Sequence, residues 1–311
     1  MEFGFGVDLG GTTVKIACFD KNGNMQDKWE IPTNTENNGR QILPDIADAV
    51  LRYCEKHSVT EVLGLGIGVP GPVTDDGVVH GCVNLGWGEV EICRQLQKLT
   101  GFRVVAGNDA TVAALGECWK GGGRGYQNMV MVTLGTGVGG GIVVNGKAIR
   151  GSHGAGGEIG HMRLNREETE TCGCGKRGCV EQYCSATGIV RLAKQRLAAA
   201  NAASVLRGRE FACKDVFEAA GNGDDLAAEV LEQVYAYLGE FLANICCVLD
   251  PEAVVLGGGV SKAGQPLLEG VRRHFEKYCF HACRDTRFAL ATLGNDAGVY
   301  GAYKLLLDKY M

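Results

Sequence analysis

Short apolar segments separated by glycine-rich turns make up two similar series along the chain. In the first series, Phe3–Leu9 ends in the turn Gly10-Gly11-Thr12-Thr13. A second segment follows at 14–19 and, after a turn at 21–24, a third segment ends at Ile31. Apolar segments of about four to eight residues, bounded by Gly, Asn or Asp, are typical of β-strands. The first series therefore predicts a three-stranded meander with a glycine-rich turn after its first strand.

The second series repeats this order. Met129–Leu134 ends in the glycine-rich turn 135–141, and apolar segments follow at 142–144 and, after Asn145-Gly146, at 147–149. An Asn-Gly pair between two such segments favours a hairpin. The repetition predicts a duplicated fold, with a cleft between two similar halves.

Helical and strand-like patterns follow each meander. Helices are expected at 41–57 and 109–120 after the first meander, and near 186–200, 225–249 and 297–309 after the second. Buried strands are expected at 62–69, 103–106 and 253–256. With 121–125 as a glycine-rich linker, we expect a smaller N-terminal α/β domain at 1–120 and a larger one at 121–296. The last helix, about 297–311, is expected to pack back on the first domain.

Composition excludes several classes of partner. The 311 residues are 45% hydrophobic and 22% charged, which is typical of a globular protein with a sizeable core. The net charge of −5 and the dispersed basic residues disfavour nucleic-acid binding. No apolar segment approaches the roughly 18 residues that a membrane span needs, and the 14 cysteines suit a reducing compartment. We therefore expect no membrane partner and a cytoplasmic location.

A histidine and three cysteines have the spacing of a zinc site. They are His161, Cys172, Cys174 and Cys179, with glycines between the thiols. Four nitrogen and sulfur donors suit tetrahedral zinc, whereas disulfides or buried core cysteines are the alternatives. We expect one structural zinc ion. The acidic residues Glu158 and Glu181 flank this loop, which indicates a polar site beside it.

The glycine-rich turns are candidates for phosphate binding. Backbone N–H groups can converge on an anion where no Cβ intervenes, although tight hairpins also favour glycine. Two such turns at corresponding positions, each with threonine, favour phosphate binding. The pattern at 135–140 also fits the dinucleotide fingerprint, but a strand rather than a helix follows it, and the chain has no Walker sequence. A nucleotide would therefore be held in another way.

Together, several motifs resemble those of the ROK family of sugar kinases and repressors. They are Asp8-x-Gly10-Gly11-Thr12, Gly68-Val-Pro70-Gly71, Asn108-Asp109, the segment 134–141, Gly157-Glu158-Ile-Gly-His161, the cysteine motif through Glu181, and Gly257-Gly258-Gly259. The resemblance spans nearly the whole chain. It implies two actin-like, ribonuclease-H-like ATPase domains that flank a cleft and close on ATP and a hexose.

Three readings compete within this family. A repressor would carry an N-terminal helix-turn-helix, for which the turn at Asp8 leaves no room. A kinase for another sugar, such as fructose, mannose, allose or N-acetylmannosamine, is the second reading. The third is glucose phosphorylation, favoured because Val83-Asn84-Leu85-Gly86-Trp87 resembles a stretch of bacterial ROK glucokinases. We expect glucose to be the substrate. The alternative from a different functional class is a sugar-binding protein that has kept the fold and lost catalytic turnover.

The resemblance and the motifs assign roles to individual residues. Phosphoryl transfer to a hydroxyl needs a base, and Asp109 is the candidate, although Asp at a helix start can also be merely an N-cap. The expected sugar ligands are Asn108, Asp109, Glu158, His161 and Glu181. The expected ligands of ATP and Mg²⁺ are Asp8, Gly10, Gly11, Thr12, Gly135, Thr136, Gly137, Gly257, Gly258 and Gly259. Lys15 is expected to point into solvent, and related enzymes suggest a homodimer or homotetramer.

Overall fold

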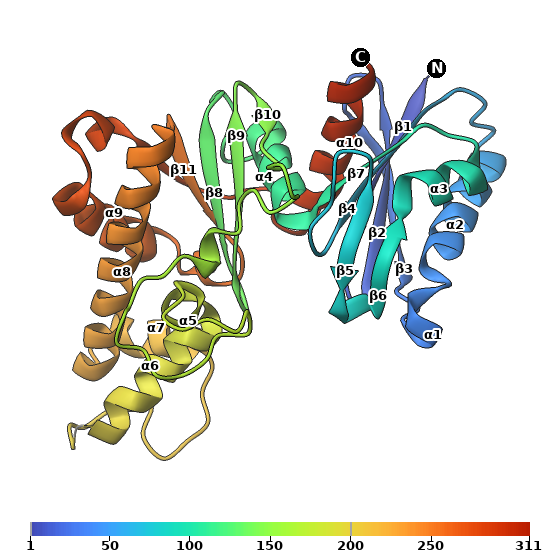
Figure 1. Cartoon of the computed structure of the whole chain (residues 1–311). Coiled ribbons are helices and arrows are strands. Elements are labelled where there is room, and N and C mark those ends of the chain that lie inside the picture. The colour runs from blue at the N-terminus through green and yellow to red at the C-terminus, as the bar shows by residue number, and fades with distance from the viewer. Residues whose placement is uncertain (1, 200) are drawn as a thin grey trace. The chain divides into compact units, whose positions relative to one another are not determined.

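The computed structural model describes residues 2–199 and 201–311, which form two compact units (Figure 1). Unit 1 runs to Gln127 and also includes Gly141–Gly157 and Leu293–Met311, whereas unit 2 comprises Asn128–Gly140 and Glu158–Thr292. Both units combine a sheet with helices, in agreement with the expected α/β class.

The sheet of unit 1 has five strands in the order β3-β2-β1-β4-β7. Its strands are β1 (Phe3–Leu9), β2 (Thr13–Asp20), β3 (Met25–Pro32), β4 (Val62–Val69) and β7 (Val104–Asn108). The first three form the predicted antiparallel meander, and β1, β4 and β7 run parallel to one another. A separate hairpin consists of β5 (Val78–Cys82) and β6 (Trp87–Glu91).

Helices cover both faces of this sheet. The helices of unit 1 are α1 (Glu36–Gly39), α2 (Ile42–Lys56), α3 (Ile92–Thr100), α4 (Asp109–Lys120) and α10 (Ala297–Tyr310). Phe5 and Val7 share one core with α2 and α3, while Phe19 shares another with α4 and α10. Glycine is required on the second face: a Cβ on Gly66 would lie 1.8 Å from the carbonyl oxygen of Ala302. The backbone of α10 therefore lies directly on the sheet.

The second sheet has the order β10-β9-β8-β11-β12. Its strands are β8 (Met129–Leu134), β9 (Val138–Val144), β10 (Lys147–Ala148), β11 (Ala253–Gly257) and β12 (Arg287–Leu290). β8, β11 and β12 are parallel. The helices of unit 2 are α5 (Glu181–Cys184), α6 (Ala186–Ala199), α7 (Cys213–Gly221), α8 (Asp225–Leu249) and α9 (Gln265–Tyr278). The apolar residues of β8 and β11 share one core with α8 and α9.

Short 3₁₀ helices complete the list of elements. They are η1 (Val83–Leu85), η2 (Ile159–His161), η3 (Val260–Ala263), η4 (His281–Asp285) and η5 (Gly294–Asp296). The sequence analysis did not predict α3, α7, α9, β12 or the β5–β6 hairpin. The helix expected near 186–200 is α6, and its expected last residue, Ala200, lies outside the described residues.

The two units differ from the predicted domain limits in the segments 121–127, 141–157 and 293–296, all of which belong to unit 1. The expected limits of 1–120 and 121–296 placed 141–157 in the second domain, whereas this segment packs with unit 1. Gly141 lies against α4, because a Cβ there would be 2.3 Å from the Cβ of Ala114. Leu293–Met311, which contains the last helix, belongs to unit 1. Within 2–199 and 201–311, no helix is both long and apolar enough to cross a membrane.

Candidate active site

The parallel strands of unit 1 bring three motifs to one edge of its sheet. Asp8 of β1 is opposite Gly68 of β4, and Val69 of β4 is opposite Asn108 of β7. Carboxyl ends of neighbouring parallel strands meet at a common edge, where open α/β sheets bind ligands. The structure therefore places Asp8, the Gly68–Gly71 motif and Asn108-Asp109 side by side, although they are far apart in sequence.

Asn108, rather than Asp109, caps helix α4. The Asn108 Oδ1 accepts a hydrogen bond from the backbone N–H of Thr111 at 3.1 Å, and its Nδ2 donates to the carbonyl of Gly71 at 3.2 Å. Asp109 is the first helical residue, so its interpretation as an N-cap is wrong. Its Oδ1 accepts from the N–H of Ala110 at 2.7 Å and from the Asn108 Nδ2 at 3.0 Å. These bonds orient a partly exposed carboxylate at a helix N-terminus, where the helix dipole favours its charge.

Asp8 has a cationic neighbour, Lys15, that was expected to point into solvent. Antiparallel pairing sets Lys15 opposite Asp8, and the Lys15 Nζ lies 3.5 Å from the Asp8 Oδ2. Both side chains are only 22% exposed. Burial raises the pKa of Asp8, while the Lys15 ammonium acts in the opposite direction. The expectation of an outward, solvated Lys15 is therefore wrong.

The first glycine-rich turn connects β1 and β2 and exposes its tip. The N–H of Gly10 donates to the carbonyl of Thr13 at 3.0 Å, and the Thr33 hydroxyl donates to the carbonyl of Gly10 at 2.7 Å. Gly11 and Thr12 are exposed. A Cβ on Gly11 would meet no atom within 4 Å, so the backbone there is open to a ligand.

The other two glycine-rich turns lie side by side in unit 2. They follow β8 and β11, which pair in parallel with Thr133 opposite Gly257. Gly258 has φ +82°, and a Cβ there would lie 2.6 Å from the carbonyl oxygen of Leu134. Glycine is therefore required for the two turns to approach this closely. The predicted ligands Gly135, Thr136, Gly137, Gly257, Gly258 and Gly259 thus come from neighbouring strand ends.

A largely apolar pocket of about 570 Å³ adjoins Gly259. Its lining, drawn from the start of α6, from α7 and from η3, includes Ala186, Cys213, Phe217 and Val260. The N–H of Ala186 donates to the carbonyl of Gly135 at 2.8 Å, which ties this pocket to the turn after β8. A ligand with an apolar ring and an anionic tail could occupy both. The contribution of α7 was not predicted from the sequence, because it depends on the packing of that helix beside η3.

The four predicted zinc ligands come together within unit 2. The ligand atoms of His161, Cys172, Cys174 and Cys179 all lie within 4.8 Å of one another. The Cys174 and Cys179 sulfurs are 3.6 Å apart, and the Cys172 sulfur is 3.8 Å from the His161 Nδ1. Zinc–sulfur bonds of about 2.3 Å in a tetrahedron place ligand atoms at nearly these separations. The residues thus fit a closed tetrahedral metal site.

The flanking acidic residues lie beside this cluster. The Glu158 Oε2 is 3.9 Å from the His161 Nε2, the ring nitrogen on the side away from the cysteines. The Glu181 Oε2 accepts from the N–H of Val138 at 3.0 Å, and its Oε1 is 3.7 Å from the Cys172 sulfur. Glu158 and His161 also line a hollow of about 690 Å³. The carboxylates thus surround the cluster without being part of it.

Glu168 connects the segment between His161 and Cys172 to helices α5 and α6. Its nearly buried carboxylate, 9% exposed, accepts hydrogen bonds from Arg191 at 2.8 Å and from the Tyr183 hydroxyl at 2.5 Å. The Arg191 hydrogen bond is the principal cause that lowers the pKa of Glu168 to about 2. Because this value is below the ordinary 4.5, the stabilisation is complete above about pH 4.5 and is lost as the pH falls towards 2.

We expect Glu168→Gln to destabilise the protein by about 1–3 kcal/mol at pH 7, since two hydrogen bonds to a buried charge are weakened. Thermal unfolding should show a smaller difference between the parent and the variant as the pH is lowered from 5 to 3. Exposed Glu167 is the matched control, and Glu167→Gln should change little. A destabilisation by Glu168→Gln that is constant over this pH range would contradict the assignment.

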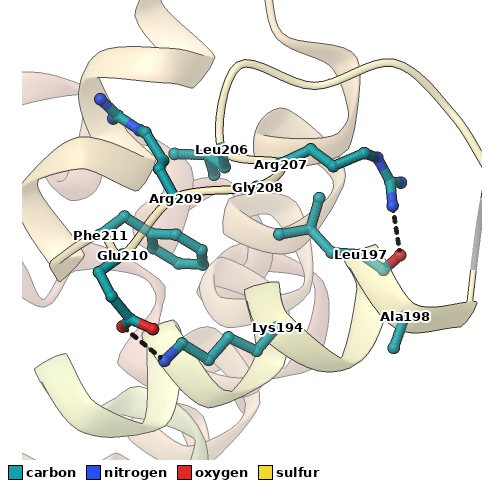
Figure 2. Close-up of a pocket in the computed structure, with 9 residues that line it drawn as sticks. All are labelled: Lys194, Leu197, Ala198, Leu206, Arg207, Gly208, Arg209, Glu210 and Phe211. Carbon is teal, nitrogen blue, oxygen red and sulfur yellow. Dashed lines mark hydrogen bonds and ion pairs between the residues drawn. The ribbon is translucent and has the colours of Figure 1, made fainter.

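Another pocket of unit 2 lies between α6 and the segment 206–211 (Figure 2). It has a volume of about 530 Å³, and its basic side chains already have partners. Lys194 pairs with Glu210 at 3.0 Å, Arg207 donates to the carbonyl of Leu197 at 3.1 Å, and Arg209 lies 3.3 Å from Asp215. None of the predicted site residues lines this pocket, so it does not enter the candidate site.

Comparison with known proteins agrees with the motifs. A sequence model of the ROK family matches residues 4–309. A glucokinase from Halalkalibacterium halodurans is 44% identical over 304 residues, which are 95% of this chain and 92% of the relative. A glucokinase from Thermotoga maritima is 33% identical over 311 residues, covering 98% and 97% of the two chains.

A solved structure resembles the fold described above. The crystal structure of a ROK family glucokinase from Streptomyces griseus, in complex with glucose and AMPPNP, matches with a TM-score of 0.76 and 35% identity. The match covers 97% of this chain and 98% of that chain. The expected actin-like, ribonuclease-H-like class of α/β domain is thereby confirmed. With its motifs at the strand ends and a family match along almost its whole length, the chain belongs to the ROK family.

Proposed function

We propose that this protein transfers the γ-phosphoryl group of ATP to the 6-hydroxyl of glucose. The observation that carries the choice of sugar is the 44% identity, along nearly the entire chain, to a glucokinase. The candidate base, the glycine-rich turns and the acidic residues beside the metal site supply the groups that such a reaction needs.

Asp109 is proposed as the base that accepts the proton of the sugar hydroxyl. Its carboxylate is held by the N–H of Ala110 and by Asn108, so one oxygen is already oriented. Weak basicity suffices, because the proton is transferred late in a loose phosphoryl-transfer step. Asn108 is proposed to bind a sugar hydroxyl beside it.

The proposed sugar ligands of unit 2 are Glu158, His161 and Glu181. A ring nitrogen of His161 faces the cysteines while the other faces Glu158, so a bound metal ion would fix the ring orientation. Four protein ligands leave no open position, and zinc there would organise the loop rather than activate water. We infer that the cluster holds one structural zinc ion.

ATP is proposed to bind at the glycine-rich turns. The pocket next to Gly259 suits adenosine, since its lining is mostly apolar and its lining residue Ala186 is hydrogen-bonded to Gly135 in the turn after β8. Gly135, Thr136 and Gly137 would contact phosphates, as would Gly10, Gly11 and Thr12 of the first turn. Asp8 would position Mg²⁺ through water, and Lys15 beside it would contribute positive charge near the phosphates.

The decisive experiment measures ADP formation from MgATP with a panel of hexoses. Glucose should give the highest kcat/KM, and formation of glucose 6-phosphate should match the ADP released. Faster turnover of fructose, mannose, allose or N-acetylmannosamine would replace the sugar but keep the reaction class. Sugar binding without any turnover would favour a non-catalytic relative, and a polyphosphate control tests the phosphoryl donor. We also propose that the protein is a homodimer or homotetramer and that it is located in the cytoplasm.

A further inference from the structure

Glu117 is a completely buried acidic residue near the C-terminal end of α4. Its Oε2 accepts a hydrogen bond from the N–H of Gly122, and its Oε1 accepts one from the N–H of Leu293, both at 2.8 Å. The carbonyl of Glu117 accepts further bonds from the N–H groups of Gly121 and Gly123, each at 3.0 Å. A buried carboxylate is costly unless it is hydrogen-bonded, so this residue depends on the backbone around it.

The amides bonded to the Glu117 carboxylate lie close to passages of the chain between the units. The chain leaves unit 1 after Gln127, shortly beyond Gly122, and returns to unit 1 for the last time at Leu293. A single side chain within unit 1 therefore holds the backbone at both places. The tight fit extends to Gly121, where a Cβ would lie 1.9 Å from the Glu117 Oε2.

Helix α4 also contacts a third passage of the chain. Unit 1 resumes at Gly141, and a Cβ there would lie 2.3 Å from the Cβ of Ala114 and 2.8 Å from the carbonyl oxygen of Ala110. Glycine at this position lets the backbone rest directly on the helix. Three of the four places where the chain passes between the units are thus held, directly or nearby, by α4.

The same helix begins with the proposed base and is fixed to its own unit. Asp109 is its first residue. Its middle lies against α10, because a Cβ on Gly116 would be 2.3 Å from the carbonyl oxygen of Ala297. Such close contact between helix backbones resists independent movement of α4.

We propose that Glu117 is a positioning residue that fixes the backbone of unit 1 at two of the passages where the chain leaves or re-enters this unit, from the helix that begins with Asp109. This inference rests on the proposed function, in which the sugar ligands are divided between the units. Asn108 and Asp109 belong to unit 1, and Glu158, His161 and Glu181 belong to unit 2. A fixed backbone at these passages limits the conformational freedom that is lost when both sets bind one sugar, whereas a loosened backbone makes joint binding less favourable.

Two variants remove the interaction from opposite ends. Glu117→Gln has nearly the same shape, but places an NH₂ group against one of the two backbone donors. Leu293→Pro deletes one of the donors, and the φ of −77° at Leu293 suits proline. Glu117→Asp keeps the charge on a shorter side chain, and it replaces Glu117→Gln in the test if that variant does not fold. Exposed Glu55 of α2 provides the control Glu55→Gln.

Hydrogen exchange and steady-state kinetics test the proposal together. In Glu117→Gln and Leu293→Pro, exchange should accelerate in peptides covering 121–127 and 290–296, while the central strand β1 stays protected. The kcat/KM for glucose should fall about 10-fold or more, the scale expected for losing a hydrogen bond to a buried charge. The affinity for ATP without sugar should fall less than this, because the proposed adenosine pocket lies wholly within unit 2 and only the proposed phosphate contacts are divided between the units.

Wild-type glucose kinetics in folded Glu117→Gln and Leu293→Pro, or a lowered Tm with unchanged kinetics, would overturn the inference and leave Glu117 a stabilising residue only. An equal loss in Glu55→Gln would also overturn it. Failure of the proposed function gives a distinguishable result, because the parent protein itself would then form no glucose-dependent ADP. This result does not depend on how fast hydrogen exchange is at 121–127 and 290–296.

Discussion

The Asp109→Asn variant is expected to lose about 10²- to 10⁴-fold in kcat while it remains folded and binds glucose, since a general base typically contributes this much. Asn108 caps α4, so the cap is untouched by the change. Both hydrogen bonds to the Asp109 Oδ1 can be kept by the amide oxygen of Asn. Single-turnover and steady-state rates of ADP formation measure the loss.

Asp225 offers a matched control for this variant. It is also the first residue of a helix, α8, directly after the capping residue Asp224, and it is exposed. Asp225→Asn therefore makes the same chemical change at the same helical position and should leave kcat unchanged. Near-normal turnover in Asp109→Asn would remove Asp109 from the role of base.

Loss of the metal ion is expected to impair sugar binding much more than nucleotide binding. Cys174→Ala should reduce the zinc content from one ion per chain and raise the KM for glucose about 10-fold or more, because His161 would lose the fixed orientation that a metal ion imposes. His161→Ala should lower zinc affinity by roughly 10- to 100-fold and weaken glucose binding at least as much. Elemental analysis, glucose kinetics and ATP titration check these results.

Cys247 is the matched control for Cys174, since both cysteines are exposed and only Cys174 belongs to the metal cluster. Cys247→Ala should keep the zinc and the kinetics of the parent protein. Active protein that contains no zinc, or unchanged glucose kinetics in Cys174→Ala, would show that the cysteines have another purpose.

The sequence predicted the elements that carry a strong local signal. The two meanders, the cluster of one histidine and three cysteines, and the strand-to-turn positions of the glycine motifs follow from patterns within a few residues. The ends of β1 and β8 lie where the apolar segments meet glycine. Helix α9, which was not among the predicted elements, also has such a signal, with a proline at its start and an amphipathic pattern.

What the sequence did not predict depends on contacts between distant residues. Lys15 lies beside Asp8 only because of the antiparallel register of β1 and β2, which a one-residue shift would reverse. The assignment of 141–157 to unit 1 depends on the contact of Gly141 with α4. Asn108 and Asp109 are both good capping residues, and only the backbone conformation shows that Asn108 is the cap.

The position of α10 has a consequence for biosynthesis. This helix is the last element of the chain, yet its Val299, Tyr303 and Leu306 form part of the core that covers one face of the first sheet. Unit 1 therefore cannot be completed until α10 has been synthesised and has left the ribosome, whereas every residue of unit 2 has been synthesised by Thr292. During translation the side of β1 that faces α10 stays uncovered until α10 emerges, so the nascent N-terminal sheet depends on a segment nearly 300 residues later to exclude water.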